Sequence, residues 1–204
     1  MKHFTAATTF KHSWDQVSSA FWQKYPGPYS KHVLSEDVVS RYISPDCKLH
    51  STRLLTKTNR MPKWGGFLFG NNSRFVSIVE ESIVDPKKKT MTTYTRNIGY
   101  QNFMVLEEKC VFTESEENKD WTQLTRQVWV SSNLYGFSRA LMAFGVERYK
   151  ANLTKSNKGI QYILDKLFVP ERVPDTLPHE VSKLRDNAKA KAQNMAARAG
   201  GIVQ

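Results

Sequence analysis

Two basic residues, Arg148 and Lys155, stand where a helical pattern predicts apolar side chains. They follow Leu134 and Leu141 at a constant spacing of seven residues, which places all four on one slowly drifting stripe of a helix. A cation that is buried without a partner is costly, so it requires an anion, water or an acidic residue nearby. The stripe could therefore line a cavity for an anionic ligand. It could also drift to the rim of the helix, where long side chains reach solvent.

Other polar residues allow several kinds of site. Lys24, at the end of an expected first helix, and Lys57, close to the end of an expected strand, could join the cations of the stripe. His32 could donate a hydrogen bond to a phosphate, or it could be an ordinary turn residue. Glu108 could act as a general base, but no recognisable motif places a serine, cysteine or lysine beside it. A partner for a cation at the edge of the core is the more common role for such a carboxylate.

Motifs for catalysis and cofactor binding are sparse. The glycine-rich segment 65–70 is not a phosphate loop, because no Gly-Lys-Ser/Thr follows it, and it is not a dinucleotide fingerprint either. The five histidines show no metal-ligand spacing, and no nucleophile elbow is present. We therefore expect a carrier or binding module rather than an enzyme, with no metal and no cofactor.

Segment 56–70 is unusual because it is both apolar and basic. Its apolar residues are Met61, Trp64, Phe67, Leu68 and Phe69, and its basic residues are Lys57, Arg60 and Lys63. Pro62 and the pair Gly65–Gly66 argue against a helix through its middle. Aromatic and basic residues side by side suit the boundary between water and an anionic membrane. A lid over an apolar pocket, or a connection that packs back onto the sheet, would also explain the segment.

The composition is that of a globular protein with an anionic partner. The chain has 204 residues and a formal net charge of +11, which predicts binding to nucleic acid, a membrane surface or an acidic ligand. No run approaches the length of a membrane-spanning helix, and the N-terminus has neither a signal-peptide core nor an arginine-rich presequence. Cys47 and Cys110 fit free thiols, and a disulfide between them is the alternative.

The pattern of elements predicts an α+β fold. A helix is expected from Trp14 to about Lys24, with Ser13 as its N-cap. Strands are expected over residues 2–10, 33–43, 48–55, 74–84, 89–98, 103–113 and 121–130. From Leu134 to Leu167 the period changes to that of a long helix. One strongly curved antiparallel sheet, closed by this helix, would leave a cavity between the two.

The C-terminal part of the chain differs from the rest. Three prolines at 170, 174 and 178 predict a stiff linker, and residues 180–198 form an Ala- and Lys-rich amphipathic segment. We therefore expect a domain over residues 1–168, followed by a linker and mobile tail over 169–204.

Three motifs carry a family resemblance. They are Phe21–Leu34 (FWQKYPGPYSKHVL), Arg53–Trp64 (RLLTKTNRMPKW), and Ser82–Pro86 (SIVDP) together with Thr90–Asn97 (TMTTYTRN). Together they resemble the PRELI domain family of mitochondrial phospholipid transfer proteins over about residues 1–168. The second motif looks more like the PRELI branch, which carries phosphatidic acid, than the slowmo branch, which is associated with phosphatidylserine.

The resemblance implies a fold and a function. The fold would be a curved seven-stranded antiparallel sheet that holds a lipid, with a long C-terminal helix and a lid loop at about residues 57–72. The function would be transfer of phosphatidic acid from the outer to the inner mitochondrial membrane through the intermembrane space, in support of cardiolipin synthesis. Family members enter without a cleavable presequence and are stabilised by a small helical partner with twin Cys-x9-Cys motifs.

The resemblance also assigns site residues. The implied headgroup-binding residues are Lys24, His32, Lys57, Arg148 and Lys155, and the implied membrane and lid residues are Arg60, Met61, Lys63, Trp64, Phe67, Leu68 and Phe69. Two positions depart from the family pattern, because Gly27 stands where asparagine is common and Gly65–Gly66 could make the lid more flexible. The alternatives are phosphatidylserine transfer by the same fold, a basic nucleic-acid-binding protein, and a lipid-modifying enzyme that uses Glu108. The nucleic-acid alternative lacks an RNA-recognition signature.

Overall fold

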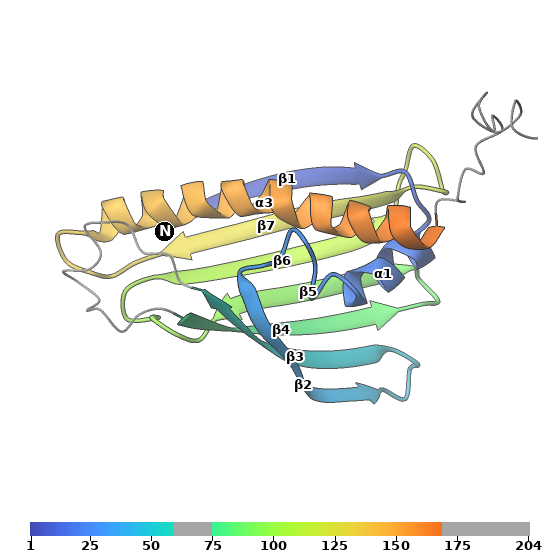
Figure 1. Cartoon of the computed structure of the whole chain (residues 1–204), viewed down its shortest axis with the longest axis horizontal. Coiled ribbons are helices and arrows are strands. Elements are labelled where there is room, and N and C mark those ends of the chain that lie inside the picture. The colour runs from blue at the N-terminus through green and yellow to red at the C-terminus, as the bar shows by residue number, and fades with distance from the viewer. Residues whose placement is uncertain (59–74, 169–204) are drawn as a thin grey trace, which may run out of the picture. The chain divides into compact units, whose positions relative to one another are not determined.

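The computed structural model describes residues 1–58 and 75–168, which form one antiparallel sheet and two helices (Figure 1). The strands are β1 (Lys2–Phe10), β2 (Val33–Ile43), β3 (Leu49–Thr58), β4 (Phe75–Asp85), β5 (Thr90–Asn97), β6 (Val105–Glu114) and β7 (Thr122–Ser131). The helices are α1 (Trp14–Trp22) and α3 (Ser138–Phe168). This order confirms the predicted α+β fold and its seven strands.

Each strand pairs in antiparallel fashion with its neighbours, and only β1 reaches across the chain for its partner. The order of the strands in the sheet is β1-β7-β6-β5-β4-β3-β2. β1 pairs with β7 in continuous register from Lys2 opposite Val130 to Phe10 opposite Thr122. β1 and β2 are therefore the two edges of a sheet that does not close into a barrel.

Helix α1 begins where its sequence predicts. The Ser13 hydroxyl accepts a hydrogen bond from the Gln16 backbone N–H, and the Gln16 side chain accepts one from the Ser13 backbone N–H, which completes a capping box. The buried face of the helix carries Trp14, Val17 and Phe21. The Trp14 indole N–H also donates to the Phe112 carbonyl at 3.2 Å, so the helix is tied to β6.

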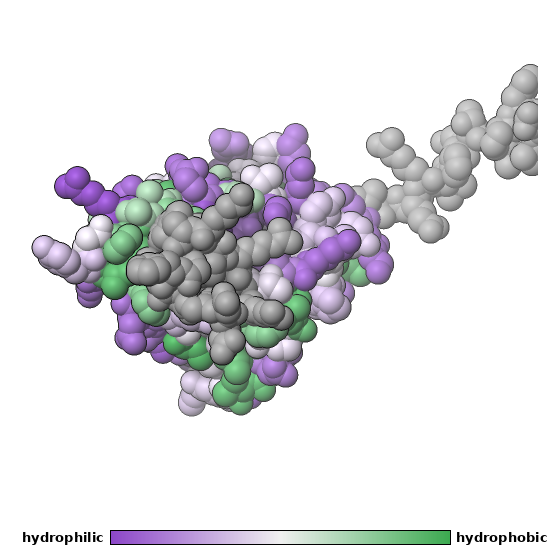
Figure 2. Space-filling model, turned by 60° about the vertical axis from the view of Figure 1, so that its left-hand side comes forward, coloured by the Kyte–Doolittle hydropathy of each residue, from purple (hydrophilic) through white to green (hydrophobic). Residues whose placement is uncertain are grey.

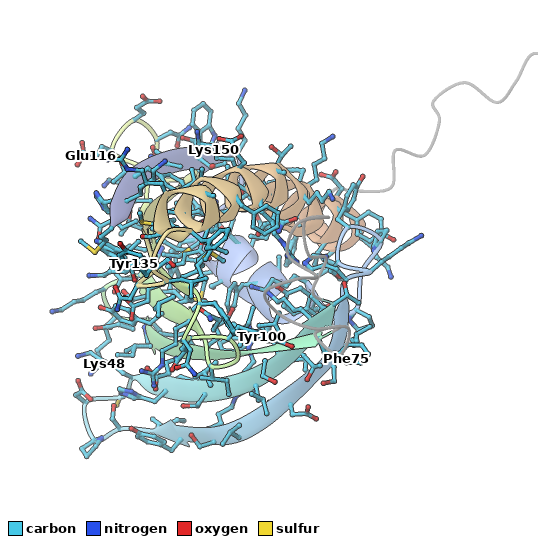
Figure 3. All side chains as sticks on the ribbon, turned by 90° about the vertical axis from the view of Figure 1, so that its left-hand side faces the viewer. Lys48, Phe75, Tyr100, Glu116, Tyr135 and Lys150 are labelled. Carbon is cyan, nitrogen blue, oxygen red and sulfur yellow. The ribbon has the colours of Figure 1, made fainter. Side chains whose placement is uncertain are left out.

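Helix α3 starts four residues later than the pattern predicted. Gly136 has a φ of +76°, a left-handed conformation that a helix does not contain, and Leu134 lies before it. The regular helix therefore begins at Ser138 and runs to Phe168. Figure 3 looks along α3 and shows the sheet curving beneath it, with side chains from both elements in the space between.

The largest group of buried apolar residues joins α1, the last part of α3 and the middle of the sheet. It consists of Phe10, Trp14, Val17, Ala20, Phe21, Met91, Cys110, Phe112, Leu124, Ile160, Ile163 and Leu164. Exposed large apolar residues also occur, and on the face drawn in Figure 2 they form separate patches among hydrophilic side chains. The core thus lies against the C-terminal part of α3, through Ile160, Ile163 and Leu164.

Candidate functional site

A cavity of about 260 Å³ lies between the concave face of the sheet and α3. Its apolar wall includes Leu106 and Phe112 from β6 and Leu141, Leu153 and Ile160 from α3. The residues of β6 that line the cavity occupy alternate positions, namely Leu106, Glu108, Cys110 and Phe112. The predicted space between sheet and helix is therefore present.

All five predicted headgroup-binding residues line this cavity. They are Lys24, His32, Lys57, Arg148 and Lys155. They come from the segment between α1 and β2, from the end of β3 and from α3, so residues far apart in the chain meet at one cavity. Their role in binding a headgroup stays a prediction.

The two cations of α3, Arg148 and Lys155, line the cavity, and one of them also reaches solvent. Arg148 is half-buried, donates to the Thr58 carbonyl at 3.3 Å, and lies 5.9 Å from the centre of the Phe144 ring. Lys155 lines the cavity and is also exposed to solvent. The stripe therefore passes along the cavity and reaches its rim at Lys155.

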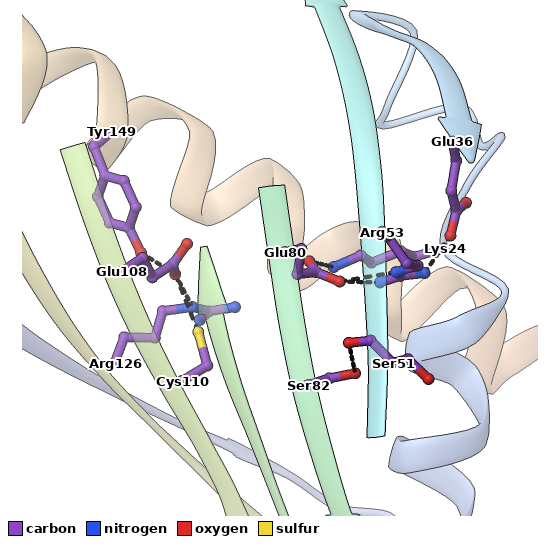
Figure 4. Close-up of polar contacts among 10 residues, drawn as sticks. All are labelled: Lys24, Glu36, Ser51, Arg53, Glu80, Ser82, Glu108, Cys110, Arg126 and Tyr149. Atoms are coloured by element: carbon purple, nitrogen blue, oxygen red, sulfur yellow. Dashed lines mark hydrogen bonds and ion pairs between the residues drawn. The ribbon is translucent and has the colours of Figure 1, made fainter. Parts of the chain in front are cut away.

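Lys24 belongs to a buried ionic network. Its ammonium group lies 3.4 Å from Glu80, and Glu80 also pairs with Arg53, which in turn pairs with Glu36 (Figure 4). Burial is the largest influence on Lys24 and lowers its pKa, but the Glu80 carboxylate together with Tyr25 and Cys110 outweighs burial and leaves the pKa above its ordinary value. Burial likewise raises the pKa of Glu80, whereas Lys24 and Arg53 hold it below its ordinary value. Both groups are therefore charged near neutral pH.

The network is electrically balanced, so it adds no net positive charge to the cavity. The positive charges of Lys24 and Arg53 are matched by the negative charges of Glu80 and Glu36. Among the described residues that line the cavity, Lys57 and Lys155 are basic side chains outside this network and outside the pair formed by Arg126 and Glu108. An anion that enters the cavity would be attracted mainly by these side chains.

A second polar cluster surrounds Glu108 (Figure 4). Glu108 accepts hydrogen bonds from the Tyr149 hydroxyl and from the Cys110 thiol at 3.1 Å, and it lies 3.4 Å from the Arg126 guanidinium. Burial and the Glu108 carboxylate together raise the pKa values of Cys110 and Tyr149. The prediction that Glu108 is the partner of a cation is confirmed.

The sequence reasoning missed Arg53 and Arg126. Arg53 lies between Ser51 and Leu55 on the buried face of β3, and Arg126 occupies the same kind of position in β7. Strand alternation was the available signal, because it places both arginines on an inward face. An inward-facing arginine predicts a carboxylate partner on a neighbouring strand.

The remaining predictions on chemistry can be checked only in part. Among residues 1–58 and 75–168 no group of histidine, cysteine, aspartate or glutamate side chains could hold a metal ion. Cys47 is exposed and Cys110 is buried, and both are free thiols. In the part of the chain that the structure describes, no helix is long and apolar enough to cross a membrane.

The predicted lid and tail lie outside the described residues. The lid residues concerned are Arg60, Met61, Lys63, Trp64, Phe67, Leu68 and Phe69. The linker and tail over 169–204 are outside the described residues as well. The predicted boundary at 168, the lid and the tail therefore remain predictions.

Comparison with known proteins decides the family. The sequence profile of a family described as "PRELI-like family" matches residues 15–170. The chain belongs to the PRELI-like family. The resemblance carried by the three sequence motifs is thereby confirmed.

Curated relatives agree with this membership. "PRELI domain-containing protein 1, mitochondrial" of Mus musculus is 50% identical over 190 residues, which cover 93% of this chain and 87% of the mouse protein. The Homo sapiens protein of the same name is also 50% identical, over 93% of this chain and 86% of its own length. "Protein UPS1, mitochondrial" of Saccharomyces cerevisiae is 34% identical over 152 residues, covering 74% of this chain and 86% of the yeast protein.

Solved structures share the fold at low sequence identity. The TTHA0849 protein from Thermus thermophilus matches with a TM-score of 0.55 and 16% identity, over 80% of this chain and 97% of its own. The di-domain ARO/CYC protein BexL matches with a TM-score of 0.54 and 10% identity, over 84% of this chain and 48% of its own. These likenesses extend the fold, but not the function, beyond the PRELI-like family.

Proposed function

We propose that this protein transfers phospholipid between mitochondrial membranes, with phosphatidic acid as its cargo. In this proposal the lipid moves from the outer to the inner membrane through the intermembrane space and supports cardiolipin synthesis. Membership of the PRELI-like family supports lipid transfer, and the relatives named as mitochondrial support the organelle. The protein acts as a carrier and performs no chemistry on the lipid.

The observation that carries the proposal is a cavity whose lining combines apolar residues with basic side chains. Each buried methylene of an acyl chain contributes about 0.8 kcal/mol, so an apolar cavity can extract lipid from a bilayer when the chains are well covered. The phosphomonoester of phosphatidic acid carries between one and two negative charges near neutral pH. Lys57, Arg148 and Lys155 supply the positive charge that such a group requires.

Selectivity follows from the same charges. A zwitterionic phospholipid would bring its own cation into a site that already has a surplus of positive charge. Phosphatidic acid brings none, and its phosphate is not shielded by a further headgroup. The site therefore favours phosphatidic acid over phosphatidylcholine, and over phosphatidylserine by a smaller margin.

Delivery requires contact with a membrane and release from it. In the proposal the segment with Arg60, Lys63, Trp64 and Phe67 docks on anionic lipid, where each nearby basic residue contributes roughly 1 kcal/mol. That binding is reversible, as a shuttle requires. A small helical partner with twin Cys-x9-Cys motifs accompanies the protein in the intermembrane space.

The test is transfer of fluorescent phosphatidic acid between liposomes by the full chain. The double variant Arg148→Glu/Lys155→Glu reverses two cations that line the cavity, and we expect the rate to fall at least about ten-fold. Lys150→Glu/Lys158→Glu is the matched control, because both lysines are exposed on α3, do not line the cavity, and change the net charge equally. Equal rates for the two double variants would refute the cavity as the headgroup site.

Two further experiments with the same protein test the competing functions. Phosphatidylserine liposomes test whether the same cavity prefers that lipid, and a faster rate than with phosphatidic acid would reassign the cargo. A gel shift with random RNA at physiological salt tests the nucleic-acid alternative. Tight binding to RNA, without lipid transfer, would overturn the proposal.

A further inference from the structure

Arg126 has hydrogen-bonding capacity that its neighbours do not use. Its side chain is 3% exposed and lines the cavity. The Nε atom lies 3.4 Å from Glu108, and Nη1 donates to the Asn157 side chain at 2.9 Å. Among the described residues, none accepts a hydrogen bond from Nη2, and Figure 4 shows one end of the guanidinium group extending away from Glu108 and Tyr149. A buried guanidinium therefore offers free N–H donors to the cavity.

The charge around Arg126 indicates what kind of group these donors would take. Glu108 neutralises the guanidinium, so this position has no surplus positive charge. An anionic phosphate would be drawn instead to cations of the cavity lining outside these ion pairs, such as Lys57 and Lys155. A neutral acceptor, such as a carbonyl oxygen, suits Arg126 because it gains a strong hydrogen bond without opposing Glu108.

The strand register connects Arg126 with Glu80, the carboxylate that pairs with Lys24. Cys110 lies opposite Arg126 on β7 and opposite Thr93 on β5. In the next row Thr95 lies opposite Glu108 on β6 and opposite Glu80 on β4. The sheet therefore carries polar side chains on four neighbouring strands, β7, β6, β5 and β4, and we call this row of side chains the polar lane.

The lane joins Arg126 to the buried ionic network of Glu80 and Lys24 by way of neutral polar side chains. Adjacent strands lie about 4.8 Å apart, so β7 and β4, which carry Arg126 and Glu80, are separated by about 14 Å across the sheet. Arg126 and Lys24 both line the cavity, and Lys24 reaches Glu80. Thr93 and Thr95 also line the cavity between them.

We propose that Arg126 is a binding residue for an ester carbonyl oxygen of the phospholipid, separate from the cations that hold the phosphate. Nη2 donates to the carbonyl, and Glu108, Tyr149 and Asn157 hold the guanidinium in place. This inference rests on the proposed function, because it names how the same cavity recognises its cargo. It adds a requirement for acyl esters that charge alone does not impose.

The experiment compares two phosphatidic acids that differ in one kind of atom. Diacyl phosphatidic acid has ester carbonyls, whereas the dialkyl ether lipid of equal chain length has none. Binding of each to the full chain is measured by competition with a fluorescent phosphatidic acid in liposomes. We expect the wild-type protein to bind the diacyl lipid about ten-fold more tightly, which corresponds to one hydrogen bond from a charged donor.

The variants remove the guanidinium group, with its planar set of donors, without leaving a buried charge unpaired. Glu108→Gln/Arg126→Gln replaces both members of the ion pair, and Arg126→Lys keeps the charge but loses the planar donors. In both variants we expect the preference for the diacyl lipid over the dialkyl lipid to fall from about ten-fold to about two-fold or less. Thermal unfolding checks that each variant is folded. Lys155→Gln is the control, because it should weaken both lipids equally and leave their ratio unchanged.

The outcomes separate this inference from the proposed function. A wild-type protein that binds both phosphatidic acids equally, or variants that keep the wild-type ratio, would overturn the ester subsite and leave lipid transfer intact. Failure of the wild-type protein to bind either lipid would overturn the proposed function and the subsite together. Loss of the ratio in Lys155→Gln as well would show that the discrimination arises from the cations outside the ion pairs and not from Arg126.

Discussion

Replacing Arg53 with methionine should destabilise the fold strongly. The Arg53 side chain is 1% exposed, pairs with Glu80 and Glu36, and lies 4.8 Å from the centres of the Phe21 and Trp22 rings. Methionine restores much of the volume but removes the charge, so Glu80 remains buried with Lys24 alone. Breaking a buried ion pair from one side costs about 3–5 kcal/mol. At about 2–4 °C per kcal/mol for a chain of this size, the melting temperature should fall by roughly 6–20 °C.

The pH dependence gives this prediction its sharpest form. Because the pKa of Glu80 is depressed in the folded state, the network contributes stability above the unfolded pKa and loses it as the pH falls through the folded pKa. In Arg53→Met the pKa of Glu80 rises, so the carboxylate is protonated more readily and its buried charge disappears. The difference in unfolding free energy between wild type and variant should therefore be largest near pH 7 and shrink below about pH 4.

Urea denaturation at pH 7 and at acid pH measures this difference. Lys48→Met is the control, because Lys48 pairs with Asp46 at the protein surface and should contribute little at either pH. The reasoning would be refuted if Arg53→Met were no more destabilised than Lys48→Met at pH 7. An equally large loss at both pH values would show that packing against the rings, rather than charge, makes Arg53 important.

Three further predictions concern packing, capping and thiol chemistry. Gly145→Ala places a Cβ 2.6 Å from the Met104 sulfur, so it should cost about 1–3 kcal/mol in urea denaturation, and Met104→Ala in the same chain should recover part of that loss. Ser13→Ala removes the N-cap of α1 and should cost about 1 kcal/mol, whereas Ser13→Asp should keep most of the stability; a full-sized loss in Ser13→Asp would contradict the capping argument. A thiol reagent should modify Cys47 rapidly in the native protein and Cys110 only after unfolding, because burial and the Glu108 carboxylate raise the pKa of Cys110; rapid reaction of both thiols would show that the cavity floor is open.

Much of the fold follows from local sequence signals. Strand alternation, turn residues and the Ser13 cap predict the elements to within a few residues because each depends on neighbours in the chain. The start of α3 was placed too early, since apolar periodicity continues through Leu134 although Gly136 adopts a left-handed conformation. Periodicity reports which face is apolar, and it does not report where the backbone leaves the helix.

The site was only half predictable for a related reason. Arg148 and Lys155 follow from spacing within one helix, and spacing is visible in a sequence. Arg53 and Arg126 depend on Glu80 and Glu108, which are 27 and 18 residues away and come into contact only through the strand register. The register is fixed by the whole sheet, so a single sequence does not specify these pairs.

The two halves of α3 rest on different supports, and this has a consequence for how the cavity is reached. Ile160, Ile163 and Leu164 anchor the end of the helix in the main core, whereas Leu141 and Arg148, in its first half, line the cavity. Bending the first half away from the sheet exposes little of the main core, so it requires much less free energy than global unfolding. We therefore expect amide hydrogens near Leu141 to exchange with solvent much faster than those near Ile163. The first half of α3 would then move to open the cavity while the main core stays folded.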